Sequence, residues 1–156
     1  MSHAEIVARL QERGLTLPTL SVPQGSYVPY VRTGALLFVA GQAPRLDGVL
    51  RYAGKVGQDI SIEQGQDAAR LCALNLLAQA AAACDGDLGR IQRLVRLAGL
   101  VNCDRDFTRH PAVIDGASDL FVQVLGERGR HARIATGAYS LPADMAVEIE
   151  AIFEVS

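Results

Sequence analysis

An arginine and two glutamates on the last predicted strands are the residues best suited to chemistry. Arg133 interrupts a small, largely apolar stretch, Ala132 to Ala138, and burying a guanidinium is costly unless a carboxylate pairs with it. Glu148 and Glu150 follow on the next strand and are natural partners, since paired charges on neighbouring strands are common. Alternatively, Arg133 binds a substrate carboxylate while a nearby glutamate holds a water molecule. Their spacing leaves both interpretations open.

Other familiar catalytic patterns are absent from the sequence. There is no phosphate-binding glycine loop, no HExxH and no GxSxG motif. His3, His110 and His131 lie in separate segments without ligand-like spacing, so we predict no metal site and no cofactor. His131 stands close to Arg133, but a single histidine at the start of a strand is more simply a hydrogen-bonded or surface residue.

Length and composition predict one domain spanning residues 1–156. The chain is 49% hydrophobic and 21% charged, with a formal net charge of −2 and a pI near 5.9. This balance excludes a disordered chain and a polycationic nucleic-acid binder. Of the 15 basic residues only Lys55 is a lysine, leaving 15 − 1 = 14 arginines. A genome biased toward arginine is enough to explain this excess of arginine over lysine for the set as a whole.

The cysteines and the N-terminal segment predict a cytoplasmic protein. Cys72, Cys84 and Cys103 form no CxxC pair, and an odd number suits a reducing compartment. We expect them to fill apolar positions rather than to act as nucleophiles. The N-terminus lacks the apolar core of a signal peptide, and no apolar run is long enough to span a bilayer, so no membrane association is expected.

Periodicity and capping signals predict an α+β domain with helices on one side of a mixed sheet. Capping boxes at Ser2 and Glu5 and at Ser61 and Gln64 mark two helix starts, and Asp47-Gly48 marks a hairpin. The second predicted strand, Leu36 to Ala40, is too apolar to have a solvated face. The expected elements are a helix over 2–14, strands over 27–33 and 36–40, a hairpin within 43–55, a helix over 61–84, a strand over 94–102, a helix from 111 to about 125, and strands over 132–139 and 146–155.

Two segments need further interpretation. Arg90, Arg93 and Arg96 sit three apart as on a helix face, although the residues that follow suit a buried strand, and we favour a strand from Leu94. On the last strand, Ile152 shares one face with the glutamates. A single helical layer covers only one side of the sheet, so another subunit should cover this face. We therefore predict a homo-oligomer with sites at its interfaces.

Five short stretches, in order along the chain, resemble the YjgF/RidA family. The stretches are Gly25-Ser26-Tyr27, Phe38-Val39-Ala40-Gly41-Gln42-Ala43-Pro44, His131-Ala132-Arg133, Leu141-Pro142-Ala143-Asp144 and Val147-Glu148-Ile149-Glu150-Ala151-Ile152. The resemblance covers residues 25–155, with the helix over 2–14 typical of a longer branch. It implies a chorismate-mutase-like mixed sheet with two helices packed on one face, in a homotrimer whose sheets face inward.

The resemblance also implies roles for individual residues. Arg133 matches the arginine that binds the substrate carboxylate, and Glu148 matches a glutamate that orients water. Tyr27 matches a tyrosine lining the cleft, and the backbone of Gly41 borders the ligand. Three positions depart from the family pattern, because Ala40 replaces a serine, Ala135 a cysteine and Asp115 an asparagine. An ionised Asp115 would oppose a bound carboxylate or pair with Arg133.

The activity implied by the resemblance is hydrolysis of reactive 2-imino and enamine acids to 2-keto acids and ammonia, in clefts between subunits. The chemistry requires no metal or covalent nucleophile. The three departures keep an alternative open, a non-catalytic protein that binds a small carboxylate metabolite in the same cleft. A ribonuclease activity, another label of this family, is disfavoured because the acidic pI argues against RNA binding. We expect no specific nucleic-acid partner.

Overall fold

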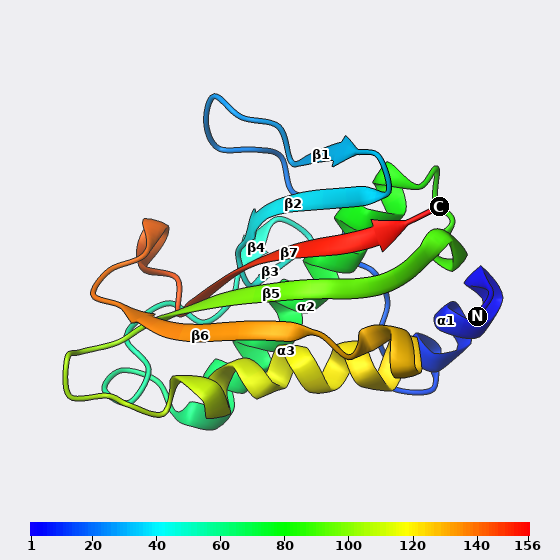
Figure 1. Ribbon diagram of the computed structural model, residues 1–156. Helices are drawn as coiled ribbons and strands as arrows, with labels where there is room; N and C mark the ends of the chain where they lie inside the picture. Colours follow the sequence, from blue (N-terminus) through cyan, green and yellow to red (C-terminus); the bar gives the residue numbers. More distant parts are fainter.

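A computed structural model describes residues 1–156 as three helices, a five-stranded sheet and a small hairpin (Figure 1). The helices are α1 (His3–Gln11), α2 (Ile62–Ala83) and α3 (His110–Leu125). The strands are β1 (Tyr30–Thr33), β2 (Leu36–Gln42), β3 (Arg45–Leu46), β4 (Val49–Leu50), β5 (Ile91–Asn102), β6 (Ala132–Ala138) and β7 (Val147–Val155). Short 3-10 turns are η1 (Leu88–Arg90), η2 (Gly126–Gly129) and η3 (Pro142–Asp144).

The main sheet is mixed and has the order β1-β2-β7-β5-β6. Only β5 and β6 run parallel, and α3 forms the crossover between them. In Figure 1, α2 and α3 lie together on one side of the sheet. This confirms the predicted α+β architecture with two helices on one face.

Helix positions follow from local signals in the sequence. Capping boxes are formed at both predicted sites, by Ser2 with Glu5 and by Ser61 with Gln64. The two long helices pack closely because Gly116 of α3 lies against the backbone of α2, where an added Cβ would stand 2.2 Å from the carbonyl oxygen of Gln66. No helix is long and apolar enough to cross a membrane.

The predicted strand boundaries near the arginine series need correction. Strand β5 starts at Ile91 rather than Leu94, and bulges interrupt its pairing with β7 between Ile91 and Arg93 and between Leu94 and Arg96. A bulge inserts one residue into the alternation. Arg93 and Arg96 therefore lie three residues apart on one strand, while Arg90 ends η1 just before it, so the helix-like spacing does not reflect a helix. Similarly, β1 starts at Tyr30 rather than at residue 27.

The two faces of the sheet differ sharply. Alternate residues of β7 point into the core beneath the helices, namely Val147, Ile149, Ala151, Phe153 and Val155. The opposite face, which we call the open face, has no helix over it and carries apolar side chains, namely Val31, Leu36, Phe38, Leu100, Ile134 and Ile152. Phe38 is 41% exposed, so β2 does have an uncovered face within one chain, contrary to the sequence-based expectation.

Candidate functional site

A pocket of about 510 Å³ lies where β2 and β7 meet two loops. One wall is the connector before β1, which includes Tyr27, and another is the loop around η3, which includes Pro142 and Ala143. Gly41 of β2 and Glu148 of β7 also line it. The structure therefore brings together three of the sequence-predicted site residues, Tyr27, Gly41 and Glu148.

Gly41 leaves the space that the Glu148 carboxylate occupies. A Cβ added at Gly41 would lie 2.5 Å from Glu148 Oε1 and 3.1 Å from its carboxyl carbon. The pairing of β2 with β7 shifts between Val39 and Gln42, immediately around this glycine. Such a bulge re-aims side chains beside a site. Glycine is thus required here for close approach, since any side chain would displace the carboxylate.

The environment of Glu148 raises the pKa of its carboxyl group. Partial burial is the main cause, because it disfavours the charged form, and the neighbouring charge of Glu150 adds to it. A carboxylate with a raised pKa at the wall of a pocket is suited to accepting a proton or a hydrogen bond from water. Glu148 is therefore the strongest acid–base candidate in this pocket.

Tyr27 reaches the pocket from the connector rather than from a strand. Tyr27 is 52% exposed, and its Oη accepts a hydrogen bond from the backbone N–H of Gln24 at 3.4 Å. The hydroxyl proton is therefore free to be donated toward the pocket. The aromatic ring forms part of the wall and shapes the space in front of Glu148.

Arg133 lies away from this pocket and pairs with Asp115. Its Nη1 donates to Asp115 Oδ1 at 2.7 Å and to Ser118 Oγ at 3.1 Å, and its Nη2 donates to the Pro111 carbonyl at 3.4 Å. All three partners belong to α3. The structural pairing of Arg133 with Glu148 or Glu150 is therefore wrong, and of the two alternatives left open for Asp115 the structure shows the pairing with Arg133. Glu150 instead faces Arg96 at 3.9 Å.

Strand register places Arg133 and Glu148 on opposite faces of the sheet. Arg133 is paired with the buried Leu97 of β5 and so points toward the helices, while Glu148 is paired with the exposed Leu100 and points to the open face. Directly paired residues share a face. One chain therefore cannot place both side chains around one small ligand, and a complete site of this kind needs a second copy.

The remaining predicted ligand-contacting positions lie outside the pocket. Ala40 borders a shallow apolar hollow on the open face, beside Phe38 and Ile152. Ala135 is partly buried on the helix side of β6 and packs against the core. Neither alanine contributes a polar side-chain group.

His131, just before β6, is a hydrogen-bonded residue, as the sequence predicted. Its Nδ1 contacts the Gly129 carbonyl at 2.6 Å and its Nε2 contacts Ser118 Oγ at 3.0 Å. Burial lowers the pKa of its imidazole, an effect that outweighs the hydrogen bond to Gly129. Ser118 thus links His131 to Arg133, and this histidine serves to position the arginine network.

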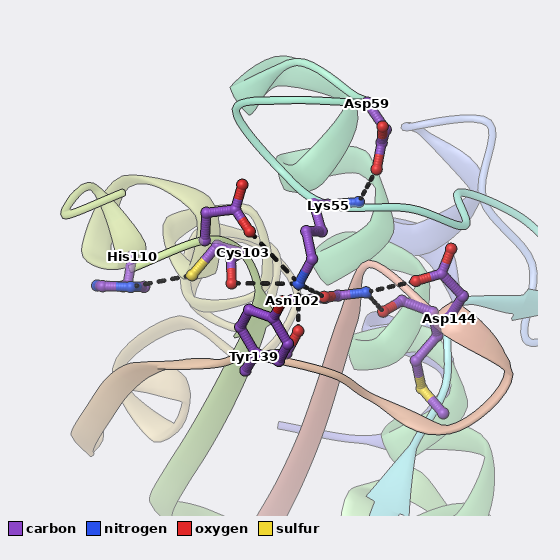
Figure 2. A network of polar contacts seen from close by, with 9 residues as sticks. Lys55, Asp59, Asn102, Cys103, His110, Tyr139 and Asp144 are labelled. Atoms are coloured by element: carbon purple, nitrogen blue, oxygen red, sulfur yellow. Dashed lines mark hydrogen bonds and ion pairs between the residues drawn. The ribbon is translucent and has the colours of Figure 1, made fainter. Parts of the chain in front are cut away.

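The cysteines are buried, and burial raises the pKa of each thiol. Cys103 Sγ contacts His110 Nε2 at 3.4 Å (Figure 2). Nowhere in the chain do three or more His, Cys, Asp or Glu side chains gather in a way that could hold a metal ion.

A polar network centres on Lys55 (Figure 2). Lys55 Nζ donates to Asn102 Oδ1 at 3.2 Å and to the Tyr139 carbonyl, and it lies 4.2 Å from the centre of the Tyr139 ring. Asn102 is fully buried and donates in turn to Asp144 Oδ1 at 3.0 Å and to the Met145 carbonyl at 3.2 Å. The network anchors the η3 loop, in which Ala143 and Asp144 both have φ of 54°.

Sequence reasoning missed four polar residues that line the pocket, namely Ser21, Gln24, Gln42 and Arg45. Gln42 is 6% exposed, and its Nε2 donates to the Ala40 carbonyl at 3.0 Å. Gln42 belongs to the Gly41 motif, and Arg45 lies between this motif and the Asp47-Gly48 turn, so their closeness in sequence to predicted features was the available signal.

Comparison with known proteins finds one family over most of the chain. Residues 7–152 match the family described as "YjgF/chorismate mutase-like, putative endoribonuclease". Protein TCP17 of Trypanosoma cruzi is 41% identical over 157 residues, covering 100% of this chain and 98% of TCP17.

Solved structures show the same fold over nearly the full length. The protein Atu1372 of Agrobacterium tumefaciens, of unknown function, is 45% identical with a TM-score of 0.94, covering 99% of this chain and 94% of that one. A protein of Shewanella oneidensis MR-1 that also carries the endoribonuclease designation is 37% identical with a TM-score of 0.93, covering 96% and 99% of the two chains.

Proposed function

Because the chain belongs to the YjgF/chorismate-mutase-like family, we propose that it hydrolyses reactive 2-imino and enamine acids to 2-keto acids and ammonia. The observation that carries this proposal is the half-buried Glu148 carboxylate, seated over Gly41 in a pocket of about 510 Å³. The site is completed by Arg133 of a second copy, and the reaction takes place in the cleft between subunits.

The proposed chemistry is addition of water to an imine, with Glu148 as the water-positioning group. Water oxygen attacks the electrophilic imine carbon while Glu148 accepts a hydrogen bond from the water. The electron pair of the C=N bond moves to nitrogen, which takes up a proton. The hydroxyl proton of the resulting carbinolamine then passes to its nitrogen, the C–N bond breaks, and ammonia leaves as the oxygen forms the C=O of the 2-keto acid. The Tyr27 hydroxyl is placed to assist proton transfer to nitrogen.

Arg133 is assigned to the substrate carboxylate. A guanidinium binds a carboxylate through two parallel hydrogen bonds, which fixes the orientation of the adjacent imine carbon. In the single chain Arg133 holds Asp115 at 2.7 Å. A substrate carboxylate must therefore share or replace this contact when it binds.

The activity is tested by ammonia release from imino acids generated in situ by an amino-acid oxidase. Wild type should exceed the rate in buffer, and Arg133→Ala should lower that excess by about 100-fold. Arg130→Ala is the matched control, because Arg130 is exposed and pairs with Glu127 on the surface. Equal rates for wild type and Arg133→Ala, or no rate above buffer, would exclude the proposal.

A homotrimer with inward-facing sheets would cover the open face. Phe38 and Ile152 form the apolar centre of this face, and an exposed apolar patch on a small domain marks an interface. Light scattering should give three times the 16.6 kDa chain mass, and Phe38→Glu should shift the mass toward that of one chain. A wild-type monomer would remove the structural basis for the shared cleft.

A second function, binding of a small carboxylate metabolite without turnover, is favoured by one observation. The pairing of Asp115 with Arg133 lowers the free positive charge available to stabilise a developing transition state. Calorimetry with 2-keto and amino acids separates the two functions, because binding without ammonia release identifies a binding protein. Ribonuclease activity is not expected for a chain of net charge −2, and intact RNA after incubation with nuclease-free protein is the predicted result.

A further inference from the structure

Arg45 is the cationic side chain that shares the pocket with Glu148. Among the residues lining the pocket, Glu148 is the one acid and Arg45 the one base. Arg45 forms no ion pair with any carboxylate of the chain. Its single side-chain hydrogen bond runs from Nη1 to the Gly48 carbonyl at 3.1 Å. A guanidinium has five N–H donors, so most of the donors of Arg45 remain available to a ligand.

The backbone of Arg45 is held from both sides. Its N–H donates to the Ala43 carbonyl at 2.8 Å, and its carbonyl accepts from Nδ2 of the buried Asn75 at 2.7 Å. The hairpin that follows turns through Asp47 and Gly48, with φ of 50° and 82°. This turn aims the Gly48 carbonyl at the guanidinium. The cation is therefore positioned at the pocket wall by fixed backbone and not by a neighbouring charge.

The roles assigned above leave this cation without a function. In the proposed reaction, Arg133 binds the carboxylate next to the imine carbon, and Glu148 positions the water. A pocket of about 510 Å³ is within the range that encloses drug-sized ligands, so a small imino acid leaves space beyond its reacting end. Guanidinium groups match carboxylates in shape and charge.

We propose that Arg45 binds a second carboxylate, at the end of the substrate side chain, and that the preferred substrates are 2-imino dicarboxylic acids. The proposal rests on the proposed hydrolysis and names its substrate class. Arg45 is then a specificity-determining residue, which acts on the far end of the substrate and leaves the reacting carbon to Glu148.

The test compares five-carbon substrates that differ only at the far end. Imino acids are made in situ from glutamate, with a terminal carboxylate, and from norvaline, with a terminal methyl group. Wild type should show at least about 10-fold higher kcat/KM for the glutamate-derived compound, the usual effect of a hydrogen bond to a charged group. Arg45→Gln should abolish this preference, lowering kcat/KM for the glutamate-derived compound by at least about 10-fold more than for the norvaline-derived one, and Arg45→Lys should restore part of it.

Arg51→Gln is the matched control, because Arg51 is an exposed arginine just after the same hairpin and lies outside the pocket. It should retain the wild-type preference. Equal losses for both substrates in Arg45→Gln would assign Arg45 a structural role and overturn the proposal. Absence of any preference in wild type would overturn it as well.

A binding measurement separates this proposal from the proposed hydrolysis. If no imino acid is hydrolysed, calorimetry with 2-oxoglutarate and 2-oxopentanoate still tests Arg45. Binding of 2-oxoglutarate that is at least about 10-fold tighter, and that Arg45→Gln reduces to the level of 2-oxopentanoate, supports the second carboxylate site. Equal affinities for the two acids in wild type would refute it.

Discussion

Replacing Asp115 by asparagine should strengthen carboxylate binding at Arg133. Asp115 Oδ1 lies 2.7 Å from Arg133 Nη1, and the two side chains are 51% and 22% exposed. A ligand carboxylate bound to the same guanidinium would face the Asp115 carboxylate as a like charge. Asparagine removes that charge and keeps the side-chain oxygen that accepts from Arg133, so the arginine stays in position.

The magnitude follows from the geometry of the pair. Two like charges about 4 Å apart repel by about 4 kcal/mol at an effective dielectric of 20 and by about 1 kcal/mol in bulk water. Because Asp115 is half exposed, solvent screening places the effect near the lower end, at about 1–2 kcal/mol. Affinity should therefore rise about 5- to 30-fold. Losing the ion pair itself should cost less than about 1 kcal/mol of stability, the usual range for partly exposed pairs.

The assay is calorimetric titration with 2-oxopentanoate at low ionic strength, comparing wild type, Asp115→Asn and Asp119→Asn. Asp119 lies one turn further along α3, is exposed and forms no ion pair. Its variant controls for the change in net charge. Added salt should shrink the gain, since it screens the repulsion. Unchanged or weaker binding in Asp115→Asn would show that Asp115 positions Arg133 and does not compete with the ligand.

Three further perturbations follow from the described contacts. Glu148→Gln should abolish most hydrolysis, by about 100-fold or more. It should also stabilise the protein toward urea at pH 7. Burial raises the pKa of Glu148 in the folded state above its pKa in the unfolded chain, so ionisation of Glu148 destabilises the folded protein as pH rises through the folded-state pKa. Glutamine cannot ionise and avoids this loss. The gain should vanish in acid, and a pH-independent difference would contradict this reasoning. Gly41→Ala should lower kcat about 10- to 100-fold with little change in melting temperature, since its Cβ would displace the Glu148 carboxylate; wild-type turnover would show that the carboxylate position is unimportant. Lys55→Met should reduce the free energy of unfolding in urea by about 1–3 kcal/mol, because Asn102 Oδ1 is buried and loses its donor, and unchanged stability would mean that another donor replaces Lys55.

Local signals predicted most of the fold. The capping box at Ser61 and Gln64 places the start of α2, and the alternation along β7 predicts which of its residues enter the core. Such signals depend on residues within a few positions of one another, so they survive in the sequence. The same locality explains the error at β5. Two bulges changed the period of the arginine series, and a bulge depends on the partner strand.

The candidate site, like the fold, could be predicted from the sequence only in part. The motifs around Gly41 and Glu148 predicted two groups that do meet in one pocket, and the sequence singled out Arg133 as an unusual charge in an apolar stretch. Only the tertiary structure decided that Arg133 pairs with Asp115 of α3 and faces away from Glu148.

The physical reason is that alternation along a strand defines two faces without saying which face is covered or which strand lies alongside. Those choices are made by the burial of apolar surface across the whole chain. The residue types that can carry this chemistry were therefore determined by the sequence itself. Which of them share a pocket, including Arg45 with Glu148, was decided by the packing of β2, β7 and their loops.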